Sequence, residues 1–144
     1  MNQTLLQTKT AAIEWATSLI PTLSFIIATS PFGRRQWQEQ QTNKVVSIPS
    51  ESGIYLVYPL TLDIPVYIGE ASDLCRRVTY HFAESKSSDN ESTLKKNLRR
   101  DGHYTSGSLS SIFRIRILPL SFGRTEIEEH LHAAHKVNTG RVTK

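Results

Sequence analysis

Two short runs of β-branched and aromatic residues constrain the fold of this 144-residue chain more than any other feature. They cover residues 54–58 and 65–68, and the segment between them contains Thr61-Leu62-Asp63. Two such runs joined by a short connection are typical of a β-hairpin, whose strands pair antiparallel. We therefore expect the core to be built on an antiparallel sheet.

Segments with helical periodicity surround the hairpin. Apolar residues recur at three- and four-residue steps from Thr8 to Ile20, which predicts a helix that ends before Pro21. Ser72 is expected to cap a second helix. Further helices are predicted over residues 93–100 and from residues 123–125 onward.

A third strand is predicted near the C-terminal helix. Residues 112–117 alternate between an apolar face and a face that carries Arg114 and Arg116. The run 23–28 fits a helix or a strand, and Ser30-Pro31 fits a helix start. The expected fold is α+β, with a small antiparallel sheet of about three strands flanked by helices. In this division, residues 1–50 form an N-terminal helical extension that packs on a domain of residues 51–144.

The composition is that of one ordinary globular domain. Lys and Arg number 17 against 13 Asp and Glu, and this mild positive excess is compatible with binding a polyanion. The single Cys75 excludes an intramolecular disulfide and a multi-cysteine zinc site. The first four residues lack the basic region of a signal peptide, so we expect a cytoplasmic protein without membrane contact.

Two glycine-tyrosine tripeptides mark the hairpin. Gly53-Ile54-Tyr55 lies on the first strand and Tyr67-Ile68-Gly69 on the second, with eleven residues between the two tyrosines. Arg77 follows Gly69 by eight residues, and His81 comes one helical turn later. A late helix supplies the carboxylate of Glu128.

This ordered series resembles the GIY-YIG nuclease superfamily over about residues 52–138. The resemblance implies hydrolysis of DNA phosphodiester bonds with one divalent metal ion, Mg²⁺ or Mn²⁺. Asn138 matches the terminal asparagine of the family, whereas Glu70 stands where many relatives have a small or basic residue. The residues that match the active site of the family are Tyr55, Tyr67, Arg77, His81 and the metal ligand Glu128.

The chemistry of these side chains suits phosphodiester hydrolysis. The planar guanidinium of Arg77 can bind two phosphate oxygens, a role for which Arg76 is the alternative. Glu128 can hold Mg²⁺, which retains waters and needs few protein ligands. Thr125 and Glu128 also have the spacing of a capping box, in which Glu128 would bond to the backbone instead.

The general base is left open among three residues. An unperturbed tyrosine is almost entirely protonated at pH 7, so Tyr55 or Tyr67 would need a lowered pKa. An unperturbed histidine has a pKa near roughly 6.5, so His81 could accept a proton without such help. A His81 base predicts a rate of cleavage that rises through about pH 6 to 7.

Basic residues concentrate between positions 95 and 116, where Asp101 is the one acid. A basic helix is usually a solvated face, but next to a nuclease-like site we expect it to follow a phosphate backbone. The predicted DNA-binding residues are Lys95, Lys96, Arg99, Arg100, Arg114 and Arg116.

A metal-dependent DNA endonuclease is the function that these observations favour. The alternative is a catalytically silent DNA-binding module that keeps the nuclease fold, and whether two chains pair into a homodimer is left open. His130, His132 and His135 lack the i,i+4 spacing and further ligands of a zinc site, so none is expected there. Trp15 is expected in the core and Trp37 at an interface.

Overall fold

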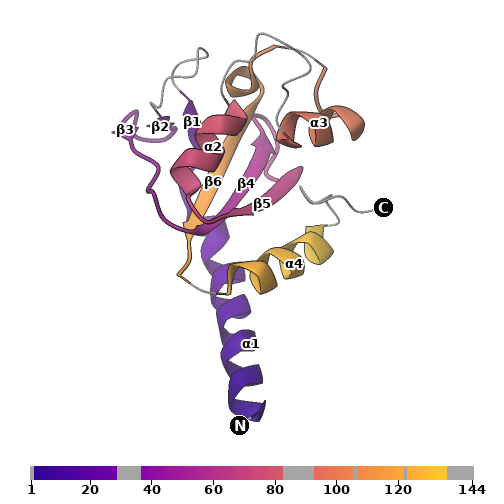
Figure 1. Cartoon of the computed structure of the whole chain (residues 1–144). Helices are drawn as coiled ribbons and strands as arrows, with labels where there is room; N and C mark the ends of the chain where they lie inside the picture. Colours follow the sequence, from indigo (N-terminus) through magenta and orange to yellow (C-terminus); the bar gives the residue numbers. More distant parts are fainter. Residues whose placement is uncertain (1, 29–36, 83–92, 106, 122, 136–144) are drawn as a thin grey trace.

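The computed structural model describes residues 2–28, 37–82, 93–105, 107–121 and 123–135. The fold is α+β, with helices on both faces of one antiparallel sheet (Figure 1). The helices are α1 (Asn2–Leu19), η1 (Ile20–Thr22), α2 (Leu74–Phe82), α3 (Thr93–Arg100), η3 (Leu109–Ser111) and α4 (Arg124–His135). The strands are β1 (Ile26–Ala28), β2 (Trp37–Glu39), β3 (Val45–Val46), β4 (Gly53–Pro59), β5 (Tyr67–Ala71) and β6 (Phe113–Pro119).

The sheet has six strands in the order β3-β2-β1-β6-β4-β5, so the prediction of about three strands is wrong. The three additional strands all come from the first 50 residues, which are therefore not a purely helical extension. The ambiguous run 23–28 contains the strand β1, which pairs with β6 through Ile26 and Ile115. The predicted helix start at Ser30-Pro31 lies outside the described residues.

The predicted hairpin and third strand form one end of the sheet, with β4 between β6 and the edge strand β5. β4 pairs with β5 on one side and with β6 on the other, and all these pairings are antiparallel. The side chains of β4 are buried on both faces because helices cover both sides of the sheet. β5 is an edge strand, so it pairs with β4 on one side and has no neighbouring strand on the other among the described residues.

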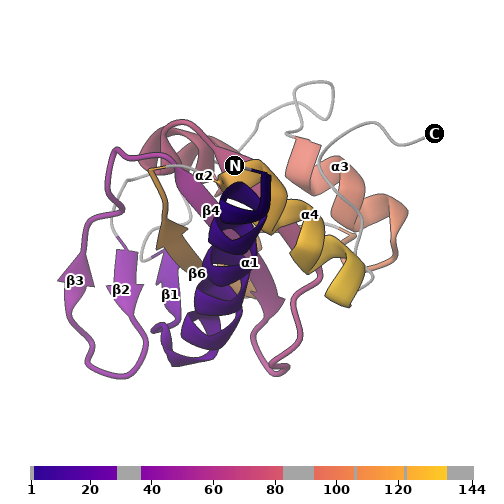
Figure 2. The same ribbon diagram turned by 90° about the horizontal axis from the view of Figure 1, so that it is seen from below.

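Two apolar clusters hold the layers together. One lies between the sheet and α2 and α3, and it includes Val78, Leu94 and Leu98. The other lies between the sheet and α1 and α4, and it includes Ile20 and Ile127. Figure 2 shows the second face, with α1 and α4 in front of the strands. The part of the chain that the structure describes contains no helix with the length and apolar character needed to cross a membrane.

Neither tryptophan lies in the environment expected for it. Trp37 is fully buried on β2, where its ring meets that of Phe82 edge to face at 5.3 Å. Trp15 instead exposes 49% of its surface on α1. Trp37 is buried because β2 extends the sheet beneath α2.

Candidate active site

The hairpin brings the two tyrosines of the tripeptides side by side. In the β4–β5 register Tyr55 lies opposite Gly69, and Val57 lies opposite Tyr67. Alternate residues of a strand share a face, so both tyrosines point toward α2. Their rings stack with centroids 6.0 Å apart.

Gly69 is required because the ring of Tyr55 lies over it. A Cβ atom at position 69 would come within 2.5 Å of Cζ and the hydroxyl oxygen of Tyr55. Gly53 is restricted in the same way, since a Cβ there would meet the backbone of Leu118 and the side chain of Leu74. The glycines of both tripeptides thus permit close packing, and neither has a positive φ.

Gly69→Ala is expected to lower the free energy of unfolding by about 2 kcal/mol, because the buried Tyr55 ring has to move. Urea titration of both proteins measures this loss. In a Tyr55→Ala background, which removes the obstructing ring, the same substitution should cost much less. An equal cost in both backgrounds would show that the packing of Tyr55 is not the cause.

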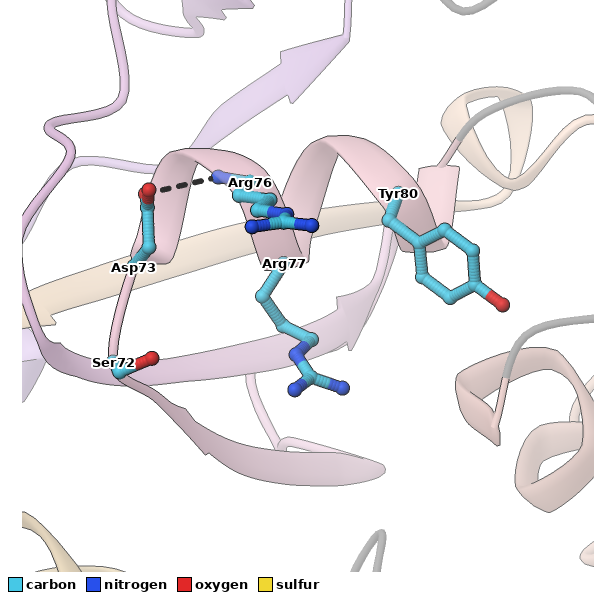
Figure 3. A pocket seen from close by; sticks show the side chains of 5 residues that line it. All are labelled: Ser72, Asp73, Arg76, Arg77 and Tyr80. Carbon is cyan, nitrogen blue, oxygen red and sulfur yellow. Dashed lines mark hydrogen bonds between the residues drawn. The ribbon is translucent and has the colours of Figure 1, made fainter.

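Helix α2 carries Arg77 and His81. Its N-terminus is capped by Asp73, whose Oδ1 accepts a hydrogen bond from the backbone N of Arg76 at 3.1 Å, and not by Ser72 as expected. Val78 is buried against the sheet, and His81 is 1% exposed at the end of the same helix. Arg77 remains exposed, with its guanidinium beyond the edge of the helix (Figure 3).

Helix α4 is attached to β5 at two points, and Glu128 lies between them. At the first turn, Arg124 Nε forms an ion pair with Glu70 at 2.9 Å, and the Thr125 hydroxyl also donates to Glu70. One turn beyond Glu128, His132 Nε2 donates to the backbone oxygen of Ile68 at 2.8 Å. Positions 124, 128 and 132 are one turn apart and share a helix face. The four-residue spacing on either side of Glu128 is visible in the sequence and could have identified Arg124 and His132 as residues that position it. The sequence-based prediction did not include them.

The capping-box alternative for Glu128 is wrong. Helix α4 begins at Arg124, and the backbone N of Ile127 donates to Gly123 O, so Thr125 already lies within the helix. Its hydroxyl bonds to Glu70 rather than to a backbone N–H. The Glu128 side chain is buried, with 2% of the residue exposed.

All five residues matched to the family's active site line one cavity of about 160 Å³. They come from β4, β5, α2 and α4 and reach the cavity from both faces of the sheet at its β5 edge. Arg76 does not line this cavity. The full lining consists of Tyr55, Tyr67, Gly69, Glu70, Arg77, His81, Thr93 and Glu128.

A hydrogen-bonded chain runs through the buried end of the cavity. His81 Nε2 lies 3.0 Å from the hydroxyl of Tyr55, and the hydroxyl groups of Tyr55 and Tyr67 share a hydrogen bond. His81 Nδ1 is buried and has no hydrogen-bond partner among the described residues.

Burial is the largest influence on the pKa values of Tyr55, Tyr67 and His81. It raises the pKa of Tyr55 well above the usual value, and the neighbouring Tyr67 raises it further. Burial also raises the pKa of Tyr67, although the hydrogen bond with Tyr55 and the charge of Arg77 act in the opposite direction. Burial and the charge of Arg77 lower the pKa of His81 to about 3. His81 is therefore neutral at pH 7 and a weak base. Because its pKa lies far below 6, its titration does not account for the expected rise in the cleavage rate through pH 6 to 7.

The lowered pKa of His81 makes stability depend on pH. The unfolded chain binds a proton at His81 below about pH 6.5, whereas the folded protein does so only near pH 3. The contribution of neutral His81 to the free energy of unfolding is thus fully present above pH 6.5 and declines as the pH falls toward 3. Between pH 7 and pH 5, the wild-type protein should lose about 2 kcal/mol relative to His81→Gln. Urea titrations at both pH values test this, and a constant difference would contradict it.

The six predicted DNA-binding residues do not form one surface. Lys96, Arg99 and Arg100 are exposed on α3, whereas Lys95 is buried. Arg114 and Arg116 lie on the other face of the sheet, where both guanidinium groups stack on Phe25. Arg116 is 7% exposed and donates to Tyr58, Asp63 and the backbone oxygens of Pro21 and Leu23. Of the six residues, Lys96, Arg99 and Arg100 are therefore the ones that are exposed together on one helix.

The donor set of the cavity fits a single hard cation. Glu128 presents a buried carboxylate beside the phenol oxygens of Tyr55 and Tyr67. Mg²⁺ is commonly held by one or two carboxylates and several waters, and a water occupies roughly 30 Å³, so the cavity has room for that shell. Within the described residues, no three His, Cys, Asp or Glu side chains gather into a metal-binding cluster. Asn138, the further match to the family, lies outside those residues.

Comparisons of this chain with models of known protein families, with curated proteins and with solved structures gave no match.

Proposed function

We propose that this protein is a GIY-YIG-type endonuclease that hydrolyses DNA phosphodiester bonds with one divalent metal ion. The observation that carries the proposal is the convergence of side chains from four separate elements on a single cavity. The residues that converge are those that the resemblance names, Tyr55, Tyr67, Arg77, His81 and Glu128.

Arg77 binds the scissile phosphate in this proposal. It lines the cavity and is exposed, and within the described ranges its guanidinium has no hydrogen bond or ion pair. A free guanidinium can bind two phosphate oxygens and neutralise the charge that develops on them during hydrolysis.

Glu128 holds the metal ion, Mg²⁺ or Mn²⁺. When bound, such an ion polarises a phosphate oxygen and lowers the pKa of a coordinated water. The two attachments of α4 to β5 keep the Glu128 carboxylate at the cavity, and the ion pair with Arg124 offsets the charge of Glu70. Glu70 can therefore line the site without adding an uncompensated charge near the phosphate.

The hydrogen-bonded chain orients the attacking water through Tyr67. Tyr55 is hydrogen-bonded to both Tyr67 and His81, so the hydroxyl group of Tyr67 is held in place at the cavity. Of the two tyrosines, Tyr67 has the smaller rise in pKa, because the hydrogen bond between them lowers the pKa of Tyr67 and raises that of Tyr55. We assign Tyr67 to the water, Tyr55 to holding Tyr67, and His81 to holding Tyr55.

Metal-dependent nicking of supercoiled plasmid tests the proposal. Purified protein should convert supercoiled DNA to the open circular form with Mg²⁺ or Mn²⁺ and should leave it intact in EDTA. A gel-shift measurement in EDTA, run in parallel, reports DNA binding separately. Binding without nicking would support the alternative, a catalytically silent DNA-binding module, and absence of both would reject the two functions together.

A further inference from the structure

A second, larger pocket adjoins the catalytic cavity along the exposed side of α2. Its volume is about 340 Å³, within the range of pockets that hold small ligands, roughly 300–1,000 Å³. Arg77 lines both the pocket and the catalytic cavity, so the two are neighbours at this residue. The lining consists of Ser72, Asp73, Arg76, Arg77 and Tyr80.

The pocket is positively charged. Figure 3 shows the guanidinium groups of Arg76 and Arg77 between Ser72 at one end and Tyr80 at the other. Neither guanidinium has a hydrogen-bond or ion-pair partner within the described ranges. The single carboxylate, Asp73, accepts a backbone N–H at the start of α2 and leaves the two arginines in excess. This composition suits an anion with more than one oxygen acceptor.

Tyr80 adds an aromatic surface to this charged pocket. The residue is 56% exposed, and its ring extends beyond the end of the arginine pair in Figure 3. One edge of the ring is supported by His81, whose ring centroid lies 5.6 Å away. An exposed tyrosine beside arginines is the combination with which proteins bind single-stranded nucleic acid, since every base has a face that can stack.

We propose that this pocket binds the nucleotide next to the scissile phosphate, unstacked from its neighbours, with Arg76 and Ser72 on its phosphate and Tyr80 on its base. This inference rests on the proposed function and adds a substrate class to it. A base inside a duplex is already stacked and paired, and its extraction costs free energy that an unpaired base does not require. The preferred substrate is therefore DNA with an unpaired nucleotide at the cut, such as a flap or an overhang.

Cleavage of matched DNA substrates tests this preference. Labelled DNAs of one sequence are presented as a full duplex, a 5′ flap, a 3′ flap and a single strand, with Mg²⁺. At least one unpaired substrate should be cut about tenfold faster than the duplex, and Tyr80→Ala should remove most of that difference. Tyr80→Phe keeps the ring and should keep the preference. Trp15→Ala, which removes a similarly exposed ring on α1 across the sheet, is the matched control.

Equal cleavage of paired and unpaired substrates by the wild-type protein would overturn the inference and leave the nuclease proposal standing. If no substrate is cut, the nuclease proposal fails. The affinity for single-stranded DNA then tests whether the pocket binds a nucleotide. Anisotropy of a labelled single strand in EDTA should then show about tenfold weaker binding by Tyr80→Ala. Unchanged affinity would overturn the inference on its own.

Arg76 has an independent readout. Arg76→Ala should reduce the slope of log affinity against log salt concentration by about 0.7 for a single strand, as expected for the loss of one phosphate contact. Lys44→Ala removes an exposed charge in the turn between β2 and β3 and serves as the control. An unchanged slope in Arg76→Ala would remove the phosphate contact from the proposal.

Discussion

Glu128→Gln should lower the rate of plasmid nicking by about four orders of magnitude while DNA binding in EDTA is retained. The amide is similar in size to the carboxylate but has no charge and binds Mg²⁺ poorly. Initial rates over a range of Mg²⁺ concentrations measure the effect, since a weakened metal site responds to added metal. Glu129→Gln changes the adjacent, exposed residue and is expected to retain activity.

The stability of Glu128→Gln separates a chemical from a structural effect. Glu128 does not cap α4, and the two attachments of that helix involve other side chains. The free energy of unfolding should therefore stay within about 1 kcal/mol of the wild-type value. Nicking at a near wild-type rate would place the metal elsewhere, and Glu70 is the other carboxylate that lines the cavity.

Arg77→Lys should reduce the rate of nicking about 10²-fold, equivalent to about 3 kcal/mol of transition-state stabilisation. Lysine keeps the positive charge but loses the planar pair of donors. The loss should appear in the rate at saturating DNA, because binding depends mainly on charge. The measurement is the single-turnover rate of plasmid nicking.

Arg76→Lys provides the comparison for Arg77. Arg76 lines the second pocket but not the catalytic cavity, so a lysine there should reduce the rate less than about fivefold. Equal losses at both positions would mean that the two arginines share the scissile phosphate and that the assignment to Arg77 alone is wrong.

Elements with long, regular patterns could be predicted from the sequence. The first hairpin strand, the strand β6 and helices α2, α3 and α4 lie close to their predicted positions, whereas the second hairpin strand, expected over residues 65–68, is β5 at Tyr67–Ala71. The strands β1, β2 and β3 are only two or three residues long, too short for an alternating pattern to emerge. They join the sheet through the pairing of β1 with β6, which is distant in the sequence, so local patterns could not reveal it.

The contrast between local patterns and contacts from distant segments also explains which parts of the candidate site could be predicted. The five residues matched to the family's active site line one cavity, because each sits on an element whose position the motif spacing already constrained. The alternation of Arg114 and Arg116 correctly indicated a strand but not its surroundings. Phe25 covers both guanidinium groups from a remote part of the chain, and no local pattern predicts such a contact.

The pairing of β1 with β6 has a consequence for how the protein folds. Arg116 donates to the backbone oxygens of Pro21 and Leu23, which lie 95 and 93 residues earlier in the chain. Contacts this distant form only after a long loop has closed, which slows folding. During synthesis, β1 emerges from the ribosome long before its partner β6. The growing chain therefore carries an open strand edge for most of its synthesis, and this is the stage at which we expect it to be most prone to aggregation.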